Sequence, residues 1–177
     1  MLGISCSFSG CLFHHTTNFL PDLPVEKLID EGKVLDLQAL KKGGNLLIIP
    51  FKAGVDAESN DDLHKISLMI VRGVSDAIQR ENAPFHILGA DNADLANLVM
   101  KGFITHLSSS GRIKRWVLRK NEIFINVEGK IVNPESGEVI IVFSHHGKAN
   151  LKTDQEQDLA RKIGEDLGLY LVRQLKN

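Results

Sequence analysis

Apolar and polar residues alternate along this chain with periods that predict two long helices and several strands. The mostly apolar run at 45–51 (NLLIIPF) favours a strand buried on both faces, with Pro50 at its end because proline has no amide hydrogen. At 61–80, apolar residues recur every three or four positions, which predicts the first long amphipathic helix. The same period predicts a second amphipathic helix, which closes the chain and begins with a capping box formed by Thr153 and Glu156.

The residues between these two helices favour β-structure. A short apolar run predicts a strand at Phe85–Leu88. The run Leu98–Leu107 is compatible with a strand or a helix, and the β-forming residues after Gly102 favour a strand. The segment 113–127 is rich in β-forming residues, and near its end apolar and polar residues alternate with the period of a strand. The turn-forming sequence at 133–137 (NPESG) then predicts a hairpin whose second strand is 138–143.

The order of these elements predicts the fold class. Strands and helices that alternate and then end in a hairpin and a closing helix are typical of an α/β protein, here an α+β sandwich. We expect one mixed β-sheet, with a long helix after the first strand and an amphipathic helix at the C-terminus. The apolar stripes of the two helices consist of Leu63, Ile66, Ile70, Val74, Ala77 and Ile78, and of Leu159, Ile163, Leu167, Tyr170, Leu171 and Leu175.

The first eleven residues, Met1–Cys11, resemble a bacterial lipobox, because small residues directly precede a cysteine. Signal peptidase accepts small residues there, and a diacylglyceryl group on Cys11 would anchor the chain in a membrane. Cys6 is a second candidate for lipidation, and a plain tail is a third interpretation. No Lys or Arg precedes Lys27, so the basic start of a secretory signal is missing, and a longer precursor would explain this. Leu12 follows the cysteine in place of aspartate, which points to the outer membrane.

The chain is therefore predicted to have three parts. Residues 1–11 form a lipoprotein signal peptide, residues 12–44 form a tether with a short helix at 25–31, and residues 45–177 form a single α/β interaction domain. The segment 52–60 is predicted to be a loop. No apolar run reaches the length of about 18 residues that a spanning helix needs, so lipid would provide the membrane attachment.

Charge limits the classes of partner. The formal net charge is −1, whereas a general nucleic-acid binder relies on a large basic surplus, so we expect no nucleic-acid partner. One basic cluster with an aromatic residue is nevertheless present. It consists of Arg112, Lys114, Arg115, Trp116, Arg119 and Lys120. Trp and Arg are frequent at interaction hot spots, so one interpretation is a partner-binding surface and the other is the solvated face and turn of a hairpin.

The sequence contains no motif that predicts catalysis or a bound cofactor. It has no Gly-x-Ser-x-Gly elbow, no P-loop and no Gly-x-Gly-x-x-Gly. His14-His15 and His145-His146 are adjacent pairs, and neighbours on a strand point to opposite faces, so we expect no shared metal ion. We therefore expect no catalytic residues, no metal site and no enzymatic activity.

Four short motifs occur in order along the domain. They are Ile49-Pro50-Phe51, Ala93-Asp94, Lys101-Gly102 and Ser136-Gly137-Glu138-Val139. This order, beside a lipobox, resembles the envelope family that includes the amino-terminal domain of TolB, the curli secretion protein CsgG and the penicillin-binding-protein activator LpoB. The resemblance covers roughly residues 45–175. It implies the α/β fold and the role of an anchored interaction module, whereas pore formation and synthase activation do not carry over.

The resemblance implies a non-enzymatic, lipid-anchored module on the periplasmic face of the outer membrane. It would be a subunit or accessory factor of an assembly such as a secretion system or a regulator of cell-wall synthesis. Its partners would be other envelope proteins, the membrane through the lipid anchor, and further copies in a homo-oligomer. Two alternatives stay open, an envelope hydrolase and a cytoplasmic nucleic-acid- or nucleotide-binding α/β domain.

Overall fold

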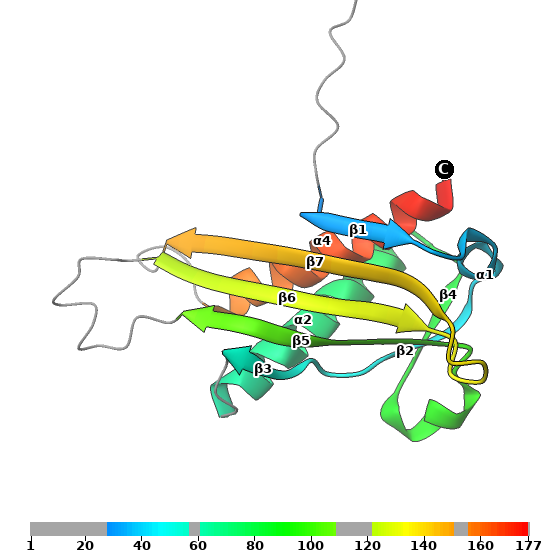
Figure 1. Cartoon of the computed structure of the whole chain (residues 1–177), viewed down its shortest axis with the longest axis horizontal. Coiled ribbons are helices and arrows are strands. Elements are labelled where there is room, and N and C mark those ends of the chain that lie inside the picture. Colours follow the sequence, from blue (N-terminus) through cyan, green and yellow to red (C-terminus); the bar gives the residue numbers. More distant parts are fainter. Residues whose placement is uncertain (1–27, 57–60, 109–121, 151–155, 177) are drawn as a thin grey trace, which may run out of the picture.

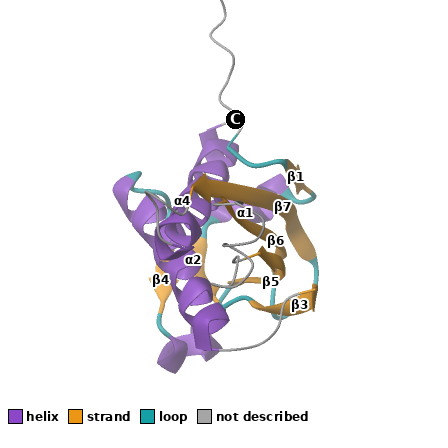
Figure 2. Ribbon diagram, turned by 90° about the vertical axis from the view of Figure 1, so that its left-hand side faces the viewer, coloured by secondary structure: helices purple, strands orange, loops and turns teal. Residues whose placement is uncertain are grey.

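Two long helices lie on one face of a seven-stranded mixed sheet, and the computed structural model describes this fold for residues 28–56, 61–108, 122–150 and 156–176. Figure 1 shows the sheet in front of the helices, and Figure 2 shows the same two layers from the side. The predicted fold class, an α/β protein with one mixed sheet and a closing C-terminal helix, is therefore confirmed.

The sheet has the strand order β1-β7-β6-β5-β2-β4, and β3 pairs with β5 beyond β2. β2 is parallel to β4 and β5, β3 is parallel to β5, and the other pairs are antiparallel. The strands are β1 (Glu31–Val34), β2 (Gly44–Ile48), β3 (Lys52–Asp56), β4 (Phe85–Leu88), β5 (Leu98–Ser108), β6 (Glu122–Val132) and β7 (Val139–Asn150).

The helices are α1 (Leu37–Lys42), α2 (Asp61–Arg80), the 3₁₀ helix η1 (Ala90–Leu95) and α4 (Glu156–Lys176). α2 has the bounds that the apolar period predicts, and the predicted stripes of α2 and α4 pack into one core. Thr153, the proposed cap of the last helix, lies outside the described residues. Within the described part of the chain, no helix is long and apolar enough to cross a membrane.

The first predicted strand, 45–51, forms β2 only as far as Ile48, and a second strand, β3, begins after Pro50 at Lys52. β2 and β3 pair one after the other with the same strand, β5. Proline cannot donate a hydrogen bond to the ladder, and Phe51 after it is buried in the core. The prediction of a loop at 52–60 is wrong for Lys52–Asp56, which forms β3, and its other residues lie outside the described ranges.

β1 and α1 belong to the fold, although 12–44 is predicted to be a tether. β1 pairs with β7, while Ile29 and Leu40 are buried in the main core. The described residues of the short helix predicted at 25–31 are irregular or belong to β1. An isolated helix this short is marginal in water, whereas pairing with β7 provides hydrogen bonds along the strand.

The hairpin of β6 and β7 follows its local sequence. Ile123, Ile125 and Val127 are fully buried on the helix-facing side of β6, as the alternation predicts. At the turn, the side-chain oxygen of Asn133 accepts a hydrogen bond of 2.9 Å from the Glu135 amide. The predicted hairpin is therefore confirmed.

α2 and α4 lie in direct backbone contact. Gly73 of α2 meets Gly164 of α4, and a Cβ atom added to either glycine would overlap a carbonyl oxygen of the other helix. One turn further along both helices, Ala77 meets Gly168, so the two helices run parallel. Because no side chain separates them here, both helices fit side by side on one face of the sheet.

Replacing Gly164 by alanine tests this contact. The added methyl group would overlap the carbonyl oxygen of Ile70, which is backbone and moves only if a helix shifts. We expect Gly164→Ala to lower the free energy of unfolding by about 2 kcal/mol, although alanine is the better helix former by about 1 kcal/mol. Urea unfolding followed by circular dichroism measures this change.

Gly89→Ala is the matched control. Gly89 has a φ of −75° and open space around its Cβ position. The free energy of unfolding should therefore change by less than about 0.5 kcal/mol. Equal stability of Gly164→Ala and the wild type would contradict the close helix contact.

Candidate functional site

Among the described residues, none covers the face of the sheet away from the two long helices, and this open face forms a hollow of about 1150 Å³. Residues of β1, β5, β6 and β7, together with Lys52 and the segment that leads into β3, line it. It is the surface that we consider as the candidate functional site.

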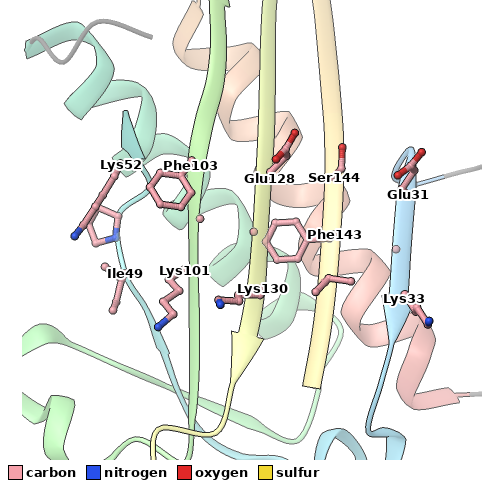
Figure 3. Close-up of a pocket in the computed structure, with 15 residues that line it drawn as sticks. Glu31, Lys33, Ile49, Lys52, Lys101, Phe103, Glu128, Lys130, Phe143 and Ser144 are labelled. Carbon is pink, nitrogen blue, oxygen red and sulfur yellow. The ribbon is translucent and has the colours of Figure 1, made fainter. Parts of the chain in front are cut away.

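Strand register places the outward-facing side chains of this hollow in two parallel rows, which Figure 3 shows. The lysine row runs from β1 through β7 and β6 to β5 and consists of Lys33, Val142, Lys130 and Lys101. The glutamate row crosses the same strands two residues away and ends on β3. It consists of Glu31, Ser144, Glu128, Phe103 and Lys52.

The residues between the two rows point toward the helices. Phe143 and Phe51 stack there with ring centroids 6.2 Å apart. A Cβ atom on Gly129 would overlap the Phe143 ring, and one on Gly102 would press against Phe51 and the β6 backbone. Because Gly129 and Gly102 have no side chains, the rings of Phe143 and Phe51 have room in the core. On the open side, the floor between the two rows is therefore bare backbone.

The charges of the open face are not paired with each other. Among the described residues, no ion pair involves the lysines or glutamates of the two rows. Lys101 and Lys130 stand directly opposite each other across β5 and β6, an arrangement of like charges that costs stability. Phe103 is 51% exposed and Val142 is 38% exposed. The face thus offers ammonium groups, carboxylates and apolar surface to a binding partner.

A second polar cluster lies where the described chain enters β1. The Asp30 carboxylate accepts a hydrogen bond of 2.6 Å from the His146 amide, and the same oxygen lies 2.6 Å from Nδ1 of His146 and 3.1 Å from Nδ1 of His145. Nε2 of His145 is 3.4 Å from the carboxylate of Asp166 on α4. The two histidines lie on opposite faces of β7, yet they share one carboxylate at the edge of the strand.

The Asp30 cluster holds the start of β1 against β7 and α4. Burial raises the pKa of Asp30, but the His146 amide, the hydrogen bond with His145 and the charges of both imidazoles lower it by more, so the pKa lies below its usual value. Tyr170 of α4 packs against Gly32 nearby, and burial raises the pKa of its hydroxyl. Within the described ranges, no group of three or more His, Cys, Asp or Glu side chains is arranged so that it could hold a metal ion.

The residues predicted from the sequence to bind lipid or partners lie elsewhere. Cys6, Cys11 and the basic cluster Arg112–Lys120 lie outside the described residues, so their roles stay predictions. The open face was missed, although its signal is present in the sequence. Lysine and glutamate stand two residues apart at 31–33 and at 128–130, the spacing that places both on one face of a strand.

The chain matches no protein-family model and no curated protein sequence. Among solved structures it is similar to the PelC dodecamer from Paraburkholderia phytofirmans, with a TM-score of 0.52, 12% identity, and coverage of 81% of this chain and 95% of that one. It is also similar to a leucine-to-methionine variant of the PelC dodecamer from the same organism, with a TM-score of 0.50, 14% identity, and coverage of 78% and 94%. Lipoprotein GNA1162 from Neisseria meningitidis is a weaker likeness, with a TM-score of 0.46, 12% identity, and coverage of 76% and 99%.

At these identities the likeness to PelC shows a shared fold and nothing more. The more specific resemblance to TolB, CsgG and LpoB stays a prediction.

Replacing Asp30 by asparagine tests the second cluster through its pH dependence. Because the pKa of Asp30 is lower in the folded chain than its usual value of 3.8, ionised Asp30 stabilises the folded state above that value. This contribution is lost as the pH falls through the lower folded pKa. Below about pH 4, we therefore expect the free energy of unfolding to fall more steeply for the wild type than for Asp30→Asn. Urea unfolding over a pH series measures both profiles, and parallel profiles would argue against the Asp30 cluster.

Proposed function

We propose that this chain is a non-enzymatic lipoprotein of the bacterial cell envelope. A lipid on Cys11 would hold it at the periplasmic face of the outer membrane. There it would act as a subunit or accessory factor of an outer-membrane assembly, such as a secretion system or a regulator of cell-wall synthesis. Its partners would be other envelope proteins and further copies of itself.

The open, charged sheet face on a fold like that of PelC is the observation that carries this proposal. Unpaired charges of both signs surround exposed apolar side chains there, and such a surface suits binding to another protein. The similar PelC structures are dodecamers, which is compatible with homo-oligomers of this fold. The lipobox supports the membrane anchor independently of the fold.

Fatty-acid labelling tests the anchor. Bacteria that produce the full-length precursor are grown with an alkyne-bearing palmitate analogue, and the protein is examined for label and for its membrane fraction. If Cys11 is the lipidated residue, the wild type and Cys6→Ser both carry the label. Cys11→Ser loses the label because the acceptor thiol is gone. Cys6→Ser is the matched control, since it removes the other cysteine of the same segment.

The labelling results also separate the alternatives. Label that disappears only with Cys6→Ser would move the anchor to Cys6. An unlabelled wild type in the cytosolic fraction would contradict the lipoprotein proposal and favour a cytoplasmic binding domain.

A further inference from the structure

The lysine row and the glutamate row cross the same strands and carry opposite charges. Lys33 lies beside Glu31 on β1, and Lys130 lies beside Glu128 on β6, in each case roughly 7 Å apart along the strand. We propose that the open face is a self-complementary docking surface for a second copy of this chain. The copies would pack sheet on sheet about a two-fold axis that runs between the two rows and parallel to them. This inference deepens the proposed function, since it names the surface through which one subunit meets another.

The direction of the axis follows from the positions of the charges. A rotation of 180° about this axis places the lysine row of each copy over the glutamate row of the other, with each strand over its own equivalent. Lys130 then faces Glu128 of the second copy, and Lys33 faces Glu31 of the second copy. By symmetry, each of these ion pairs occurs twice in the interface.

The two-fold axis perpendicular to the rows in the plane of the face is unfavourable. An axis parallel to the strands would place the lysine row over itself and the glutamate row over itself. Like charges that face each other across an interface cost several kcal/mol. The charge pattern therefore selects the axis along the rows.

The remaining members of the rows are compatible with the same arrangement. Lys101 would face Phe103 of the second copy, where an ammonium over an aromatic ring is favourable, and Val142 would face Ser144. The exposed parts of Phe103 and Val142 would then be covered. Lys52 ends the glutamate row on β3, beyond the end of the lysine row, and would stay at the solvated rim.

The hollow between the two rows has room for the long side chains of the second copy. Lysine stems pack along apolar surface while their ammonium groups reach a partner charge, so the long side chains of the second copy would fill the space above the bare backbone floor. Because the row charges form no ion pair within the described chain, contact between copies would replace bound water and break no existing ion pair.

An acidic macromolecule is the competing occupant, and the two glutamates argue against it. Such a partner would satisfy the lysine row but would meet Glu31 and Glu128 as like charges. A partner that carries both signs at the same spacing satisfies both rows, and a second copy of this chain carries that pattern.

Charge reversal tests the proposal on the full chain, in a non-ionic detergent where the chain is lipidated. The variants are Lys130→Glu, Glu128→Lys and the double variant that carries both changes. Each single variant places like charges opposite each other, so we expect its dimer dissociation constant, measured by sedimentation equilibrium, to rise at least about tenfold. The double variant exchanges the two signs and restores each pair, so its dissociation constant should return to within about threefold of the wild type.

Lys162→Glu is the matched control, because Lys162 is exposed on α4, on the opposite side of the molecule from the hollow. It should associate like the wild type, and circular dichroism verifies that every variant folds. A monomeric wild type, single variants that associate normally, or a double variant that does not recover would each overturn the proposal.

Heparin serves as a polyanion probe for the competing occupant. Self-docking would be overturned in favour of an acidic partner if the wild type is monomeric and binds heparin, and if Glu128→Lys binds heparin more tightly than the wild type does.

Fatty-acid labelling does not depend on these charges. Failure of self-docking therefore leaves the lipoprotein proposal standing, and absence of label leaves self-docking standing.

Discussion

The backbone contact between α2 and α4 is the constraint on which the rest of the structure depends. Gly73 against Gly164 and Ala77 against Gly168 let the two helices touch without side chains between them. Ion pairs at the rim, such as Arg161 with Asp76, add to this contact, but exposed pairs of this kind contribute little. Both long helices consequently lie on the same side of the sheet, where they close the main core (Figure 2). The opposite side carries neither of them, and its charged side chains stay accessible.

The open face acquires its chemistry from strand geometry. Successive side chains of a strand point to opposite faces, so glutamate and lysine two residues apart on β1 and β6 appear together on the outer side. Register then aligns these short patterns into rows across the sheet. The likeness to PelC extends to the fold, and at 12% identity it says nothing about such residues. Because one fold supports many functions, the function proposed here depends on the face itself.

Parts of the fold and of the candidate site could have been predicted from the sequence. Gly164 and Gly168 stand four residues apart on the apolar side of a predicted helix, a spacing that indicates close approach of a second helix. The alternation of Glu128 with Lys130 indicated one charged face of β6. The sharing of Asp30 by His145 and His146 had no such signal, because these residues are more than a hundred positions apart in the chain and only the pairing of β1 with β7 brings them together.

The sequence by itself determined the elements whose signals are local. The bounds of α2, the alternation along β6 and the turn at 133–137 each depend on neighbouring residues, and periodicity and turn chemistry report these directly. Tertiary structure decided the rest. β1 exists as a strand because β7 offers it a partner, and β3 continues the ladder after Pro50 because β5 is long enough to pair with two strands in succession. The open face also depends on long-range contacts. The packing of helices that are distant in the sequence decides which side of the sheet stays uncovered.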